Sequence, residues 1–95
     1  MSAAYETIIV LNTKLDEEAT KAMVEKFTSL IAANGTIDSV EEWGKRKLAY
    51  EIEDETEGYY VLINFTSATE FTKELDRIYQ ITDGVLRTII VRKNA

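Results

Sequence analysis

The sequence predicts an α+β fold of the ferredoxin-like kind, a βαββαβ sandwich in which a four-stranded antiparallel sheet carries two helices on one face. The first observation is that strand-like and helix-like hydrophobic patterns alternate in this order along the 95 residues. The second is length, which suits a single domain spanning residues 1–95. The third is that proline is absent and no linker or repeat interrupts the pattern.

The first part of the chain predicts a strand followed by a helix. Tyr5–Asn12, YETIIVLN, is short and rich in β-branched and aromatic residues, which is typical of a strand. The period then changes to that of a helix, whose first turn holds the acids at positions 16–18. Asn34 and Gly35 predict its end, with Gly35 free to adopt a positive φ. The apolar stripe of this helix contains Ala19, Met23, Phe27, Leu30 and Ile31.

Two strands and a hairpin loop are predicted next. Thr36–Glu53 is a long extended run, and Gly44 in its middle indicates a bulge or a bend. The polar residues 54–58, DETEG, predict the loop, and Tyr59–Thr66 predicts the third strand.

The last part of the chain predicts a helix and a strand. The segment SATE predicts a capping box, with Ser67 as the N-cap and Glu70 reaching back to it. Residues 82–84, TDG, predict a turn before the final strand, VLRTIIVRK. The apolar side of the helix contains Phe71, Leu75 and Ile78.

The handedness rule for crossover connections places the first and third strands at the centre of the sheet. The second and fourth strands are then edges, and the basic segment Lys45–Lys47 lies on one of them. Lysine on an edge strand is a common guard against wrong pairing, so this segment has a purely structural interpretation as well as a functional one.

The face of the sheet away from the helices is predicted to hold apolar residues, because either choice of strand parity leaves some there. An apolar surface with a cationic rim suits a protein partner, an RNA, or both. The candidates for the partner-facing part of the sheet are Tyr60, Leu62, Ile89 and Val91.

The charge is unevenly distributed. The chain has 17 acids and 11 bases, a net charge of −6, which argues against general binding to nucleic acid. Local basic segments can still bind RNA while the acidic remainder faces away. The candidate RNA-binding residues are Lys45, Arg46, Lys47, Arg87, Arg92, Lys93, Tyr5 and Trp43. For Trp43 and Tyr5 a packing role is the competing interpretation.

Nothing in the sequence indicates an enzyme, a cofactor or a metal site. Histidine and cysteine are absent, which removes the commonest general base and the commonest metal ligands. No glycine-rich phosphate loop is present either. No signal peptide and no membrane span are indicated, so we expect a cytoplasmic protein that binds neither a membrane nor a small-molecule substrate.

The sequence resembles the bacterial small-subunit ribosomal protein S6 family over nearly its whole length. The resemblance rests on YE at Tyr5–Glu6, LDEE at 15–18, NG at 34–35, WGKRKLAYEI at Trp43–Ile52, GYY at 58–60 and VLRTIIVRK near the end. The segment WGKRKLAY, followed some residues later by a Gly-Tyr pair, is the most specific of these.

The resemblance implies a ferredoxin-like structural protein of the small ribosomal subunit. Such a protein binds the central domain of small-subunit ribosomal RNA as a heterodimer with ribosomal protein S18. Two differences from the family pattern are evident: MSAA supplies no basic residue before Tyr5, and Thr13 stands near the position of a usual proline. The rival interpretation is a ferredoxin-like module that senses a small molecule or binds another protein.

Overall fold

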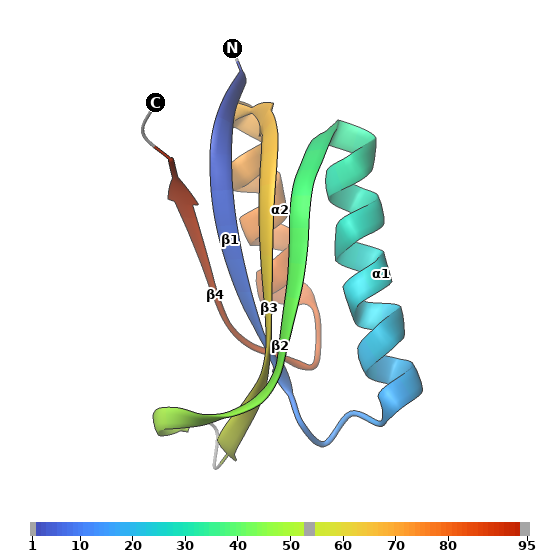
Figure 1. The fold of residues 1–95 in the computed structure, drawn as a ribbon, viewed down its shortest axis with the longest axis vertical. Helices are drawn as coiled ribbons and strands as arrows, with labels where there is room; N and C mark the ends of the chain where they lie inside the picture. Colours follow the sequence, from blue (N-terminus) through green and yellow to red (C-terminus); the bar gives the residue numbers. More distant parts are fainter. Residues whose placement is uncertain (1, 53–54, 94–95) are drawn as a thin grey trace.

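The computed structural model describes residues 2–52 and 55–93, in the predicted order of strands and helices (Figure 1). The elements are β1 (Ser2–Asn12), α1 (Glu17–Asn34), β2 (Gly35–Ile52), β3 (Glu55–Ala68), α2 (Thr69–Ile81) and β4 (Val85–Arg92). The four strands form one antiparallel sheet with the order β2-β3-β1-β4. The predicted ferredoxin-like fold is therefore confirmed, and so is the predicted position of β1 and β3 at the centre of the sheet.

Both helices pack on the same face of the sheet, because their apolar side chains join one core with alternate residues of β1 and β3. On β1 these residues include Ile9 and Leu11, and on β3 they include Val61 and Ile63. The helices contribute Phe27, Ile31, Phe71, Leu75 and Tyr79 to this core. All residues of the predicted stripes except Ala19 belong to this core or pack against it, and Tyr79 is an addition to them. Neither described helix is long and apolar enough to cross a membrane.

The hairpin between β2 and β3 is longer than predicted. β3 begins at Glu55, so Glu55–Gly58 is strand and not loop, while Glu53 and Asp54 lie outside the described residues. Where β2 and β3 run beyond the rest of the sheet, β2 swings away from α1 (Figure 1). We call the distal part of this hairpin, residues 44–52 and 55–58, the arm.

Two glycines act in different ways. Gly44 has φ +78° at a shift of the β2–β3 register, so the predicted bulge is confirmed. Gly35 has φ −175°, which is extended, so the prediction of a positive φ is wrong. Gly35 is needed for a close approach instead, because a Cβ there would lie 2.3 Å from the carbonyl oxygen of Thr66.

The two helices begin differently. Asp16 is the N-cap of α1, and its carboxylate accepts a hydrogen bond of 2.7 Å from the backbone N–H of Ala19. The capping box predicted at Ser67 is wrong, because Ala68 is the N-cap of α2 and has no side-chain cap. Ser67 is still part of the sheet, paired with Ala3, and its buried hydroxyl donates to the carbonyl of Ala68.

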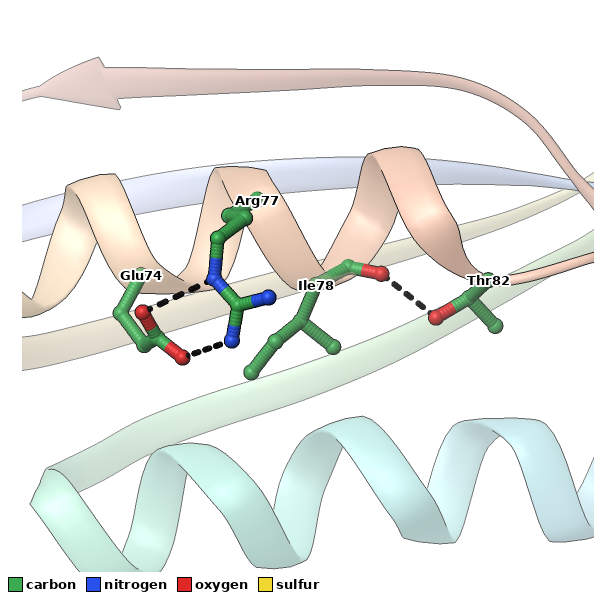
Figure 2. A network of polar contacts seen from close by, with 4 residues as sticks. All are labelled: Glu74, Arg77, Ile78 and Thr82. Carbon is green, nitrogen blue, oxygen red and sulfur yellow. Dashed lines mark hydrogen bonds and ion pairs between the residues drawn. The ribbon is translucent and has the colours of Figure 1, made fainter.

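The exposed side and the end of α2 are held by local contacts (Figure 2). The Arg77 guanidinium donates to the Glu74 carboxylate one turn earlier, and this hydrogen bond lowers the pKa of Glu74. Thr82 follows the last helical residue, and its hydroxyl donates to the carbonyl oxygen of Ile78. This bond satisfies one of the carbonyls that a helix end leaves free.

A buried hydrogen bond joins α2 to the central strand. The Thr7 hydroxyl donates to the carbonyl of Ile89 at 3.0 Å, so its oxygen accepts from the phenol of Tyr79 at 3.1 Å. Both side chains are almost fully buried, with exposed fractions of 0% and 2%. Burial raises the pKa of Tyr79 strongly, because the charged phenolate would lose its solvation.

We expect Tyr79→Phe to lower the free energy of unfolding by about 1 kcal/mol near neutral pH, because the Thr7 oxygen loses its donor. In the wild type the pKa of Tyr79 is raised in the folded state, so the unfolded chain loses the phenol proton at a lower pH than the folded chain does. The contribution of Tyr79 to the free energy of unfolding is therefore complete below pH 10, the ordinary tyrosine value, and is lost as pH rises above it. The variant should lack this alkaline loss. Urea unfolding of both proteins from pH 7 to 11 tests this, and parallel curves would contradict it.

Candidate functional site

The antiparallel register arranges the side chains of the open face, opposite the helices, in rows that cross the sheet. Gly44 is opposite Tyr60, Tyr60 is opposite Val10, and Val10 is opposite Arg87. With Trp43 beside Gly44, we call Trp43, Tyr60, Val10 and Arg87 the aromatic row. The next row, Glu41, Leu62, Ile8 and Ile89, is the apolar row. The third, Ser39, Asn64, Glu6 and Val91, is the acceptor row.

The aromatic row starts with a stack at the bulge of β2. The rings of Trp43 and Tyr60 lie nearly parallel, with centroids 6.3 Å apart and an angle of 16° between them. The Arg46 guanidinium lies 5.8 Å from the Trp43 ring, within the range of a cation–π interaction. Trp43 is 39% exposed, so it combines packing on Tyr60 with an accessible surface.

The arm folds over the other end of the aromatic row. The Arg87 guanidinium donates a hydrogen bond of 2.8 Å to the phenol oxygen of Tyr50 and lies 6.0 Å from its ring. This contact joins β2 to β4, the two edge strands of the sheet. We call the Tyr50–Arg87 contact the clasp. In the described part of the chain it is the one hydrogen bond that the Arg87 side chain forms, so other guanidinium donors remain for a ligand.

Gly58 lets the arm approach the sheet closely. A Cβ at this position would lie 2.3 Å from Val10 Cγ1 and 3.2 Å from Leu48 Cδ2. Val10 is only 4% exposed although it is on the open face, because the arm covers it. A hollow of about 200 Å³ lies next to Val10, lined by Ile8, Val10, Tyr60, Arg87, Thr88 and Ile89.

The four residues predicted to face a partner all lie on the open face. Tyr60 belongs to the aromatic row, Leu62 and Ile89 to the apolar row, and Val91 to the acceptor row. Leu62 is buried by its neighbours, whereas Ile89 is 41% and Val91 is 52% exposed. Of these four residues, the exposed ones are therefore the two on β4.

The basic segment on β2 is divided between the two faces of the sheet. Lys45 is opposite Tyr59 and lines a groove beside α1 with Glu17, Lys21 and Glu42. In that groove the Tyr59 phenol donates to the Glu42 carboxylate at 2.8 Å, a hydrogen bond that raises the pKa of Tyr59. Arg46 is opposite Gly58 and belongs with the open face, and Lys47 is opposite Glu57. All three cations are exposed.

The remaining predicted residues lie at the far end of β1 and β4. Arg92 is opposite Tyr5, and both line a groove on the helix side with Lys73 and Asp76 of α2. The Tyr5 ring stacks on Phe65 at 5.6 Å and is 6% exposed, so it belongs to the core. Lys93 is exposed, and its backbone N–H donates to the carbonyl of Ala4.

Sequence reasoning missed Tyr50 and the pair formed by Glu6 and Asn64. Tyr50 lies in a strand segment whose pattern gives no indication that the arm turns back across the sheet. Glu6 and Asn64 are far apart in sequence, and only the register of β1 with β3 makes them neighbours. The described residues include no group of three or more acidic side chains placed to hold a metal ion.

We expect Tyr50→Phe to loosen the arm without unfolding the sheet, because it removes the clasp's acceptor and keeps the ring. Backbone amides of residues 45–50 should exchange with deuterium roughly threefold to tenfold faster, as expected when one hydrogen bond is removed. Amides of β1 should be unaffected. Arg87→Lys is the matched change on β4, and it should have a similar effect because lysine lacks the planar fork. Unchanged exchange of the arm in both variants would contradict the role of the clasp.

Known proteins match this chain over nearly its full length. The family model described as Ribosomal protein S6 matches residues 4–92. Small ribosomal subunit protein bS6 of Clostridium perfringens (strain SM101 / Type A) is 60% identical over 90 residues, covering 94% of this chain and 95% of that protein. The bS6 protein of Clostridium botulinum (strain 657 / Type Ba4) is 59% identical over 88 residues, covering 92% and 94%.

The fold agrees with a solved structure as well. The crystal structure of 30S ribosomal protein S6 from Thermotoga maritima superposes with a TM-score of 0.92 at 32% identity. The match covers 98% of this chain and 89% of that one. From the matched sequence and the shared fold, we conclude that the chain belongs to the ribosomal protein S6 family.

Proposed function

We propose that this chain is a structural component of the small ribosomal subunit in the cytoplasm. In this proposal it binds the central domain of small-subunit ribosomal RNA together with ribosomal protein S18. Family membership supports the ribosomal role, since the similar proteins are named as small-subunit proteins. The same membership agrees with the prediction that the chain is not an enzyme.

The observation that carries the RNA-binding part of the proposal is the aromatic row, which contains Arg87, together with Arg46, which lies over the Trp43 ring of that row. Arg46 and Arg87 each lie over an aromatic ring and remain exposed, one near each end of the row. Guanidinium groups bind phosphate in a bidentate manner, and exposed ring faces can stack on unpaired bases. The row therefore offers an RNA strand both kinds of contact within one edge-to-edge line of the sheet.

The partner-binding part is supported by the apolar row and by the overall charge. Exposed apolar surface at Ile89 and Val91 needs a cover in a stable assembly. The net charge of −6 favours association with a basic protein and opposes binding of RNA by this chain alone. A basic partner would contribute attraction for the RNA that this chain lacks.

Two double variants with equal loss of charge test which cations meet the RNA. We expect Arg46→Ala with Arg87→Ala to weaken assembly on ribosomal RNA more than Lys45→Ala with Lys47→Ala, because of these four cations the two arginines are the ones that lie over aromatic rings. The slope of log affinity against log salt should flatten by roughly 0.7–0.9 for each phosphate that the variant no longer neutralises. Filter binding of the chain with S18 across a salt series measures both quantities.

Unchanged affinity and salt slope in the lysine variant would show that Lys45 and Lys47 do not contact RNA and only protect the edge strand from wrong pairing. The same result in the arginine variant would show that the aromatic row is not part of the RNA interface. Thermal unfolding serves as the folding control for both. Sedimentation of the tagged chain with the small ribosomal subunit at moderate salt tests the broader proposal, and a chain that stays at the top of the gradient contradicts it.

A further inference from the structure

The acceptor row holds a carboxylate that pairs with no described cation. Glu6 lies on the central strand β1, directly opposite Asn64 on one side and Val91 on the other. Its side chain is half-buried and forms neither a hydrogen bond nor an ion pair with any described residue. Arg92, the next cation along the chain, lines the helix-side groove, and Lys93, whose backbone N–H donates to the carbonyl of Ala4, also forms no ion pair with Glu6.

A second acceptor lies beside this carboxylate. Asn64 donates through Nδ2 to the Ser39 hydroxyl at 2.9 Å, which leaves its Oδ1 buried and without a donor among the described residues. Directly opposite residues on neighbouring strands have Cβ atoms roughly 4.5–5.5 Å apart, so one donor group can reach both side chains. Rotating the amide by 180° would exchange its two ends, and Glu6 would still form no ion pair with a described residue.

The neighbours of Glu6 make an unpaired carboxylate costly. Ile8 and Ile89 of the apolar row flank it along the sheet, and Val91 lies beside it. Apolar surroundings penalise a charge that has no partner and strengthen its attraction for a cation that arrives. A protein that covers this surface would remove the remaining water and would therefore have to supply that cation.

We propose that the acceptor row binds one basic side chain, an arginine or a lysine, of a protein partner whose apolar residues cover the apolar row. This inference rests on the proposed function, and it assigns the acceptor row as the place where the protein partner contacts this chain with a basic side chain. RNA is a poor occupant here, because Glu6 repels phosphate. A second copy of this chain is also disfavoured, since each copy carries a net charge of −6. The open face is thus divided between two ligands. Phosphate groups of RNA would bind at the aromatic row, and a cationic side chain of the protein partner would bind at the acceptor row.

Calorimetric titration of the full chain with purified ribosomal protein S18 from the same organism tests the assignment. We expect Glu6→Gln to weaken binding by at least about tenfold, since it leaves the partner's cation unpaired. Glu25→Gln, an equal charge change on the exposed side of α1, should leave the affinity within about twofold. Glu6→Asp keeps the charge and should retain most of the affinity. The melting temperature of free Glu6→Gln should be unchanged or higher, because a carboxylate without a partner is removed.

Each other outcome overturns the inference in a recognisable way. Equal affinities for Glu6→Gln and Glu25→Gln, with the wild type binding S18, would exclude a cation at this row and leave the proposed function standing. A lower melting temperature together with lower affinity would make Glu6 a structural residue. Stronger binding of a central-domain RNA fragment by Glu6→Gln, with S18 affinity unchanged, would assign the row to RNA. No binding of S18 by the wild type would overturn the proposed partner and this inference with it.

Discussion

β1 pairs with β3 on one side and with β4 on the other, in antiparallel registers that alternate its side chains between two environments. Thr7, Ile9 and Leu11 enter the core below the helices, whereas Glu6, Ile8 and Val10 face the open side. A slip of one residue would exchange these sets and place a carboxylate in the core. The buried Thr7–Tyr79 hydrogen bond opposes that slip, because it joins one position of β1 to α2.

The same registers build the candidate interface. Each open-face residue of β1 brings its partners on β3 and β4 into line, so residues distant in sequence become the three rows. The chemistry changes from row to row, from arginines on aromatic rings, through aliphatic side chains, to acceptors. A surface graded in this way can contact an anionic and a cationic partner at once, because the apolar row separates the two.

The arm adds a second layer to this arrangement. Its path depends on Gly44, which takes a positive φ at the bulge, and on Gly58, where Val10 and Leu48 leave no room for a side chain. The clasp then links the two edge strands over the open face. The central strands are stabilised by the whole core, but the arm rests on a few exposed contacts. We therefore expect it to be the part of the interface that adjusts on binding.

The sequence by itself determined the order of the elements, the strand arrangement and the apolar sides of the helices. Periodicity and handedness are local or general rules, so they need no knowledge of contacts. It also identified Trp43, Arg46 and Arg87 as candidates, because an acidic chain with clustered bases shows the contrast directly.

Only the tertiary structure decided which side of the sheet each cation occupies. The bulge at Gly44 precedes Lys45–Lys47, and their cross-strand pairing separates Lys45 from Arg46. The predictions for Ser67 and Gly35 are wrong for a related reason: close pairing in the sheet overrides the capping and turn preferences of the isolated segments. The clasp and the pair of Glu6 with Asn64 could not be predicted at all, because each joins residues whose proximity follows from strand pairing and not from sequence spacing.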